Sequence, residues 1–587
     1  MSLVAEQFQD EITFVRNVVR DFAKVNPQLL QFIIEEETDP DVERLIEGLA
    51  YITSTLKLKL KHDFPELIQS LLVLLWPNYL KPIPSLTILE ASINDETQQV
   101  MLPRGNNVYY QTQTLFPYTF QTCRDLIVTP LIISDLQLSR QLQNDSLIIH
   151  FKLDTNFKPR NLNDLQFYLG EDSYVGSILY MMLMNYVESG CIVINGVELP
   201  LTNLQFSPIG FSREQSLLPY AENTNKGFRI LHEYFAFPEA FLFLQLSHQD
   251  DHILPDSIDY SEFQLKISFS HMFDSRIKLR KNMIKLNCVP AINLFSHDSE
   301  PILLDGKKEK YPLVASYQNS DQFEIFTVTK VESGSRRNKN GKKRAEYVDF
   351  NSFDHQHQFD KGRDKLFYNV VETQDKRTLA IRHWLSFIRG DEENWINKIE
   401  TISVTLLCSN KDKPSNLKIG ELKQVISLEN HIQVYLTNII RPTLQLVPMI
   451  DETQYWTTIS NLAKNYNSLL QKDILKQLFQ SYHFPAMHNR QEEKSLLKVI
   501  SGIVEIDSKQ VERKLKNGLI VRGVETYLYL SQSVFKSEGD LYVWSTVLAH
   551  FFAQQAALNS FHLLNVINVD NQEHYTWPVK IGQHLLI

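Results

Sequence analysis

Residues 39–56 read DPDVERLIEGLAYITSTL, and residues 64–90 read FPELIQSLLVLLWPNYLKPIPSLTILE. The first stretch predicts an α-helix, because Asp39 is a favourable N-cap residue and Pro40 suits the first helical turn. Its apolar residues recur in alternating steps of three and four along one seam: Val42, Leu45, Leu49, Ile52 and Leu56. A seam of this kind indicates a helix that packs against a partner.

The second stretch is apolar on every side from residue 64 to residue 79, which indicates a helix that is buried all round. Trp76-Pro77 should end it, because proline supplies no backbone N–H. Residues 3–24 predict a further helix, whose seam consists of Phe8, Ile12, Val15, Val19 and Phe22. We therefore expect an N-terminal helical bundle. The ten seam residues are our candidate partner-interface residues, although packing inside the chain would give the same pattern.

Several short runs in this chain occur in the order of one known family. They are 39–48, 64–67, 76–80 and 82–85, followed by 293–295 (NLF), 410–414 (NKDKP), 441–443 (RPT), 522–525 (RGVE) and 559–561 (NSF). On these runs the chain resembles the TssF family, also called VasA or ImpG, the baseplate wedge subunits of the bacterial type VI secretion system. The resemblance covers nearly the whole chain and implies a fold similar to the large wedge protein of contractile phage baseplates. In two places the chain differs from the family: Lys411 stands where arginine is usual, and the loop 336–344 looks specific to this member.

The resemblance implies a structural subunit with no catalytic activity. Such a subunit joins TssG, with two TssF copies for each TssG, and six of these wedges surround a VgrG hub. TssK links the wedges to the membrane complex, and TssE links them to the contractile sheath. One sequence in two places meets different neighbours, so we expect adjustable joins near 82–84 and near residue 400, with a fixed elbow stiffened by prolines as the alternative at 82–84. The implied location is the cytoplasm, docked at the inner membrane face through the baseplate.

The composition agrees with a folded protein of several domains. The chain has 587 residues, a net charge of -10 and a pI of about 6.0, so its bulk charge favours neither nucleic acid nor anionic lipid. The four cysteines form no CxxC pair, which favours a reducing cytoplasm. The first residues are acidic where a signal peptide needs positive charge, and the longest apolar run is about half of the roughly 20 residues that span a membrane. We expect no direct membrane insertion.

Periodicity divides the chain into three predicted domains: a helical segment (1–85), a mainly β region (86–400) and a mixed α+β domain (401–587). In the middle region, 147–153 alternates apolar and polar residues, and Asn195-Gly196 predicts a hairpin. Further strands are predicted at 241–246, 263–269 and 323–331. In the last domain we predict strands at 401–407, 432–436 and 524–530, helical structure at 456–478, and a long helix with Leu541, Trp544, Leu548 and Phe551 that ends near Asn559. The fold class is thus a multidomain α+β protein.

The sequence predicts no catalytic, cofactor or metal site. P-loop, dinucleotide, GxSxG and HExxH patterns are absent. Asp354, His355, His357 and Asp360 could in principle hold a divalent metal, but no second ligand pair accompanies them, so a solvated loop is preferred. The basic run 332–344 predicts a mobile loop or a hairpin tip, with binding to an acidic protein surface or to nucleic acid as alternatives.

Two other function classes remain open from the sequence. The strand-rich middle region, with 24 Tyr and 34 Phe in the chain, is compatible with a carbohydrate-binding or carbohydrate-active β protein. The second class is a scaffold protein that binds a different partner. The resemblance favours the baseplate subunit over both.

Overall fold

The structure is a computed structural model in which part of the chain is described. The described residues are 12–13, 44–45, 47–53, 72, 76–93, 98–111, 117–140, 144–153, 159, 161–163, 165–221, 226–250, 260–337, 344–350, 366–374, 381–389, 400–427, 432–448, 458–460, 466–514 and 520–582. The chain divides into two compact units. Unit 1 contains residues 1–79 and 450–463, and unit 2 contains residues 80–449 and 464–587.

The described residues of unit 1 are mainly helical. They include Ile12 and Thr13, most of 44–53, Leu72 and 458–460. The backbone N–H of Trp76 donates to the carbonyl of Leu72 at 2.7 Å, and a turn at Pro77 follows. Leu72 is helical, the turn at Pro77 lies where the helix was predicted to end, and the Leu72 and Trp76 side chains are fully buried. The rest of the helix predicted at 64–79 lies outside the described residues and stays a prediction. Tyr79 is also buried, and its hydroxyl accepts a hydrogen bond from Thr458 Oγ1 at 3.0 Å.

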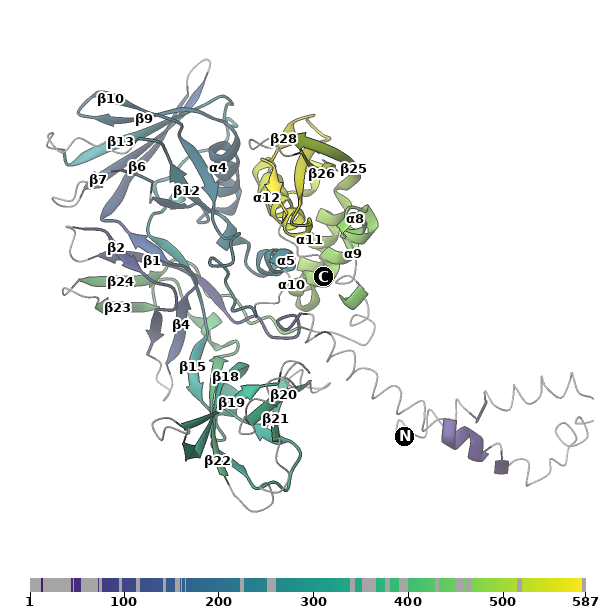
Figure 1. The fold of residues 1–587 in the computed structure, drawn as a ribbon. Helices are drawn as coiled ribbons and strands as arrows, with labels where there is room; N and C mark the ends of the chain where they lie inside the picture. Colours follow the sequence, from purple (N-terminus) through teal and green to yellow (C-terminus); the bar gives the residue numbers. More distant parts are fainter. Residues whose placement is uncertain are drawn as a thin grey trace, which may run out of the picture. The chain divides into compact units, whose positions relative to one another are not determined.

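Unit 2 begins with a six-stranded antiparallel sheet in the order β23-β24-β1-β14-β4-β3 (Figure 1). Its strands are β1 (Leu86–Ile93), β3 (Asn107–Tyr110), β4 (Tyr118–Thr122), β14 (Cys288–Ile292), β23 (Lys423–Ser427) and β24 (Gln433–Asn438). The sheet curls into a near-barrel, so that its two edge strands, β3 and β23, come close together. The backbone N–H of Tyr109 on β3 donates to Gln424 Oε1 on β23 at 3.4 Å. The pair β2 (Val100–Leu102) and β5 (Leu126–Val128) contributes to the same apolar core.

A five-stranded and a three-stranded sheet follow. The first contains β10 (Val197–Leu201), β9 (Val187–Ile194), β13 (Glu262–Phe269), β7 (Asp145–Leu153) and β6 (Leu131–Arg140); the second contains β11 (Gln205–Pro208), β12 (Phe243–Ser247) and β8 (Gln166–Tyr168). The predicted alternation in 147–153 is confirmed, since every odd-numbered side chain is buried. The Asn195-Gly196 hairpin is also confirmed, with φ values of +50° and +84°. The strand predicted at 241–246 begins later, because Pro238–Phe241 forms a 3₁₀ turn (η2).

The eight-stranded sheet has the order β15-β22-β18-β19-β20-β21-β17, with β16 also paired to β22. Its strands are β15 (Phe295–Asp298), β16 (Ile302–Leu304), β17 (Tyr311–Leu313), β18 (Glu324–Arg337), β19 (Arg344–Asp349), β20 (Leu366–Gln374), β21 (Ile381–Arg389) and β22 (Glu400–Ser409). Consecutive strands β16 and β17 join its two ends, so the sheet curls around one core. A loop that starts at residue 332 is wrong, because β18 continues to Arg337: it pairs with β22 as far as Ser333 and with β19 at Arg337, which lies opposite Arg344. The antiparallel pairing of β18 with β19 agrees with the alternative prediction of a hairpin, whose tip at 338–343 lies outside the described residues.

The last part of unit 2 packs helices against a mixed sheet. The sheet contains β25 (Ile503–Lys514), β26 (Ile520–Leu530), β27 (Ser560–Asn568), β28 (His574–Thr576) and β29 (Lys580–Ile581). The helices are α4 (Ser173–Asn185), α5 (Lys226–Ala236), α8 (Tyr466–Leu469), α9 (Lys472–Tyr482), α10 (Phe484–His488), α11 (Arg490–Ser501) and α12 (Glu538–Gln555). Leu541, Trp544, Leu548 and Phe551 of α12 are buried as predicted. The helix is nevertheless buried on nearly all sides, because it lies between α4, α5 and β27, and it ends at Gln555.

The fold is a strand-rich, multidomain α+β protein. Strands from both sides of residue 400 share the near-barrel and the eight-stranded sheet. The predicted division of the chain into domains at residues 85 and 400 stays a prediction. Short 3₁₀ turns complete the described elements: η3 (Lys281–Met283), η4 (Ser320–Gln322), η6 (Lys413–Asn416) and η8 (Gln532–Val534).

Candidate functional site

The helical segment 44–53 presents an apolar seam to solvent. Leu45, Leu49 and Ile52 are 74%, 52% and 57% exposed, and their i, i+4, i+7 spacing places them on one face. Ala50, on the opposite side of the helix, is fully buried. The helix therefore packs through its small residue and leaves the larger aliphatic side chains without a cover.

The other predicted seam residues have different positions. Ile12 lies in a helical turn and is buried, so it belongs to the packing of unit 1. Six candidates lie outside the described residues: Phe8, Val15, Val19, Phe22, Val42 and Leu56. The role of all ten residues as a partner interface stays a prediction.

Two of the family-like runs meet in the core of unit 2. Asn293 and Asn410, 117 residues apart, exchange hydrogen bonds: Asn410 N–H donates to Asn293 Oδ1 at 2.6 Å, and Asn293 Nδ2 donates to Asn410 Oδ1 at 2.9 Å. Asn293 Nδ2 also donates to the carbonyl of Thr119 on β4 at 2.7 Å. Because Asn293 follows β14 and Asn410 follows β22, this buried pair fastens the near-barrel to the eight-stranded sheet.

Other runs meet in the same way. Ser85 Oγ donates to the carbonyl of Thr443 at 2.6 Å, and the N–H of Leu86 donates to Thr443 Oγ1 at 3.0 Å. Gly523 lies opposite Phe561 in the parallel pair β26 and β27, and a Cβ at Gly523 would come within 2.5 Å of the Phe561 ring. These runs therefore hold distant parts of the chain together.

Lys411 stands in a contact that needs only a single positive charge. Its Nζ donates to the carbonyl of Ser320 at 3.1 Å and lies 3.9 Å from the Glu324 carboxylate. Burial raises the pKa of Glu324, and the lysine opposes that shift. A point charge satisfies a carbonyl and one carboxylate oxygen, so a lysine suffices at this position, where the family usually has an arginine.

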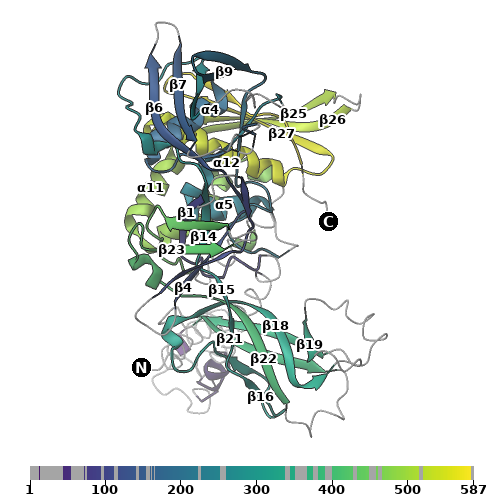
Figure 2. The same ribbon diagram turned by 90° about the vertical axis from the view of Figure 1, so that its left-hand side faces the viewer.

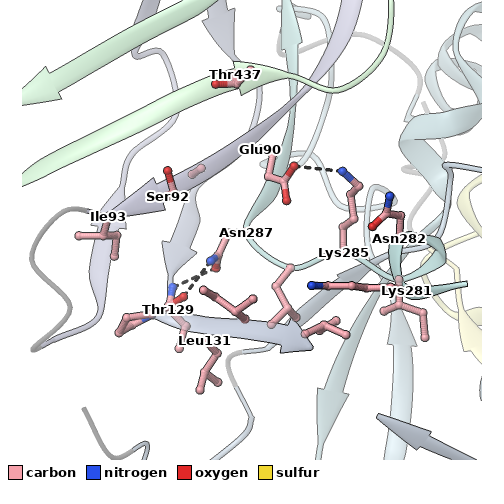
Figure 3. A pocket seen from close by; sticks show the side chains of 16 residues that line it. Glu90, Ser92, Ile93, Thr129, Leu131, Lys281, Asn282, Lys285, Asn287 and Thr437 are labelled. Carbon is pink, nitrogen blue, oxygen red and sulfur yellow. Dashed lines mark hydrogen bonds and ion pairs between the residues drawn. The ribbon is translucent and has the colours of Figure 1, made fainter. Parts of the chain in front are cut away.

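A cavity of about 370 Å³ lies between the near-barrel and the start of β6 (Figure 3). Its polar groups are mostly paired with one another: Lys285 Nζ lies 3.1 Å from Glu90 Oε2, and Asn287 Nδ2 donates to the Thr129 carbonyl at 2.8 Å. No nucleophile with a neighbouring general base lines it. The cavity therefore lies at a junction between sheets.

The sequence reasoning missed a buried ion pair. Arg229 and Glu233 on α5 lie 2.9 Å apart, and both side chains are almost fully buried. Glu233 Oε1 also accepts the backbone N–H groups of Leu217 and Leu218, at 2.8 and 3.3 Å, so α5 holds the preceding loop. Burial raises the pKa of Glu233, and Arg229 opposes the rise. The i, i+4 spacing could have revealed this pair.

The segments predicted as alternative metal or nucleic-acid sites lie mostly outside the described residues. In the described part of the chain, no group of three or more His, Cys, Asp and Glu residues could hold a metal ion. Asp354, His355, His357 and Asp360 lie outside that part, as do the side chains of the basic run from 335 to 345. The four cysteines are free thiols.

Comparison with known proteins gives consistent results. The family model "Type VI secretion system, TssF" matches residues 2–584. The "Type VI secretion system component TssF1" of Pseudomonas aeruginosa is 24% identical over 98% of this chain and 98% of its own length.

Two solved structures share the fold. A chain from the cryo-electron microscopy structure of the type VI secretion system TssK-TssF-TssG baseplate subcomplex matches with a TM-score of 0.77 and 24% identity, covering 92% of this chain and 98% of that one. A chain from the baseplate complex of the type VI secretion system matches with a TM-score of 0.61 and 21% identity over the whole of both chains.

None of the helices among the described residues is long and apolar enough to cross a membrane. The family match spans almost the entire sequence, and several of the runs that suggested the resemblance contact one another across long distances in the sequence. The chain belongs to the TssF family of type VI secretion system baseplate components.

Proposed function

We propose that this chain is a wedge subunit without enzymatic activity, which assembles with TssG-type and TssK-type partners to build the platform for the tail tube and the contractile sheath. The similar chain of the TssK-TssF-TssG baseplate subcomplex supports these partners. We extend the proposal to two copies of the chain for each TssG, to TssE at the sheath and to a VgrG hub. Its place would be the cytoplasm, at the inner membrane face. Its fold would be similar to that of the contractile phage wedge protein.

The observation that carries the proposal is the exposed seam at Leu45, Leu49 and Ile52. Burying one such side chain contributes about 1.5–3 kcal/mol. Three of them on one helical face therefore supply a useful part of the free energy that association needs, against the loss of translational and rotational freedom. A helix that offers this face suits a partner helix with a matching apolar stripe.

Co-expression with a TssG-type subunit tests this assignment. We expect the variant with both Leu45→Asp and Leu49→Asp to lose most co-purification, because two carboxylates would be buried at the contact. Tyr51→Asp is the matched control, since Tyr51 is 59% exposed on the same helix but lies away from the seam. It should co-purify like the parent chain.

Circular dichroism should show the same helix and strand content in all three proteins. If the soluble double variant binds the TssG-type subunit as tightly as the Tyr51→Asp control, the seam is not the partner interface. If the purified parent chain hydrolyses a glycan, the assignment as a structural subunit is also wrong.

A further inference from the structure

Strand β25 is the edge strand of its sheet. It pairs with β26 on one side, from Ile503 opposite Leu530 to Lys514 opposite Ile520, and no described strand pairs with its other side. Only Ile503 is buried; Ile506 and Val511 are half-buried, and the remaining residues are exposed. Figure 2 shows β25 and β26 extending together to the outer end of the sheet.

The free edge has a defined beginning. Lys472 Nζ donates to the carbonyl of Val504 at 2.6 Å, which occupies the edge next to the helices. From Glu505 to Lys514 the outer edge faces no described strand. Alternate backbone N–H and C=O groups along such an edge are satisfied in full only by water or by another extended strand. The ligand class that fits is therefore an extended polypeptide.

The charges along this edge are arranged with opposite signs at its two ends. Glu505 and Asp507 come first, and Lys509 and Arg513 follow, all on one face of the strand because they are odd-numbered. A second copy that runs antiparallel presents the same residues in reverse order. Acidic positions then face basic positions, so the strand is complementary to itself.

The charges also select a register. A twofold axis at Ser508 places Asp507 of each copy opposite Lys509 of the other, and places Glu505 between the diagonal positions of Lys509 and Arg513. An axis at Asp507 or at Lys509 would place identical charges opposite each other, which is unfavourable. A twofold axis at Gln510 would place Lys509 of one copy diagonal to both Lys509 and Arg513 of the other copy. That register would bring like charges together, which is also unfavourable.

We propose that β25 is a homotypic contact, in which two copies of this chain pair antiparallel with Ser508 facing Ser508 across a twofold axis. The inference rests on the proposed function, because a wedge assembly brings several copies close together. Charges on an edge strand ordinarily prevent indiscriminate pairing. In β25 the charges disfavour the neighbouring registers and favour the register with the twofold axis at Ser508.

The contact is expected to be weak in dilute solution. Lys509 already lies 3.5 Å from Asp507 of its own strand and 5.4 Å from the centre of the Tyr527 ring, and Arg522 holds Glu512 at 2.8 Å. Pairing with a second copy would replace these exposed contacts within the chain by exposed ion pairs between chains, which gains little free energy. The high local concentration inside an assembly is what favours pairing.

Site-specific crosslinking of the full-length chain tests the register. Cys191, the half-buried thiol, is first replaced by serine, since the other three cysteines are buried. Ser508→Cys should give a crosslinked dimer with a short bismaleimide, in the purified complex with TssG-type and TssK-type partners and at high concentration of the chain alone. Gln510→Cys is the matched control, because the proposed axis separates the two thiols by four residues, or about 14 Å.

Charge exchange provides the second arm. Asp507→Lys in the Ser508→Cys background should lower the crosslinked dimer about tenfold, because two cross-strand attractions become repulsions. Adding Lys509→Asp should restore it. If Asp507 and Lys509 only stabilised the fold of their own chain, the second substitution would not restore the crosslinked dimer.

Equal crosslinking of the two cysteine variants, or no dimer from Ser508→Cys in either sample, would overturn the proposal. A charge exchange that fails to restore the dimer would do the same. These results are distinct from failure of the proposed function, which is measured by co-purification with the TssG-type subunit through the seam.

Discussion

At the scale of single residues, the buried asparagine pair explains why short runs far apart in the sequence occur together. Asn293 has no exposed surface, and its amide has three hydrogen bonds: with the Asn410 side chain, the Asn410 backbone and the Thr119 carbonyl. A buried amide of this kind specifies one arrangement of the strands around it, because any other arrangement leaves polar groups without partners.

Replacing this amide should destabilise unit 2. We expect Asn293→Ala to cost about 1–3 kcal/mol, because the Thr119 carbonyl and the Asn410 backbone N–H each lose a hydrogen-bond partner in the core. Asn369→Ala, at an exposed position of β20, is the control and should change the free energy of unfolding by less than about 0.5 kcal/mol. Urea unfolding followed by tryptophan fluorescence measures both. Equal midpoints would show that the pair does not hold the two sheets.

The sequence predicts residue contacts only where they are local. Asn195-Gly196 could be recognised because a two-residue turn depends on its own backbone conformation. The Arg229–Glu233 pair was within reach, since its spacing is that of one helical turn. The Asn293–Asn410 contact was not, because no local signal connects residues 117 positions apart.

At the scale of elements, local periodicity predicted several strands but not how far they extend. The strand β18 runs through Gly334 to Arg337, because β22 pairs with it as far as Ser333 and β19 pairs with it at Arg337. The apolar face predicted for α12 was only part of its buried surface, because helices on one side and a sheet on the other enclose it. Tertiary partners decide both features, and they are not visible in a window of ten residues.

Histidines packed around α5 and α12 make this region sensitive to acid. Burial lowers the pKa of His232 and of His562 to about 3, and that of His483 to about 4. These side chains are neutral in the folded state, whereas the unfolded chain binds protons below about pH 6.5. Stability is therefore complete above pH 6.5 and is lost as the pH falls toward the folded pKa values, by at most about 1.4 kcal/mol per pH unit for each histidine.

The urea midpoint measured between pH 7.5 and pH 5 checks this dependence. His562→Gln should reduce the slope by about one proton, while its amide can still reach Thr526 Oγ1, which lies 3.0 Å from His562 Nε2. Asn369→Ala, at an exposed position of β20, should leave the slope unchanged, because neither side chain binds a proton in this pH range. A slope that is identical in all three proteins would assign the acid sensitivity to carboxyl groups instead.

At the scale of the whole molecule, the two units have different tasks in the proposed function. Every described strand belongs to residues 86–581, so the sheets and the two apolar cores that they enclose are built within unit 2. Directly after the boundary at Tyr79, the chain forms backbone hydrogen bonds with the rest of unit 2. Ile83 and Leu446 exchange backbone hydrogen bonds of 2.8 and 3.0 Å, which makes the proline segment 82–84 a fixed part of unit 2.

A chain without unit 1 should fold but fail to assemble. In this variant residues 1–79 are removed and 450–463 are replaced by a Gly/Ser linker of equal length. We expect a soluble protein with a strand-rich circular dichroism spectrum and cooperative unfolding, because both cores retain all their residues. Co-purification with the TssG-type subunit should be lost, because the seam at Leu45, Leu49 and Ile52 is absent.

The full-length variant with Leu45→Asp and Leu49→Asp separates the two reasons for such a loss. If both proteins are folded and neither binds, the seam is the interface and unit 2 is the scaffold that carries it. If the shortened chain still binds the TssG-type subunit, then unit 2 provides the contact, and the exposed seam must face another partner. If the shortened chain is insoluble although its two cores are intact, unit 1 covers apolar surface of unit 2, and the division into a folding unit and an assembly unit is wrong.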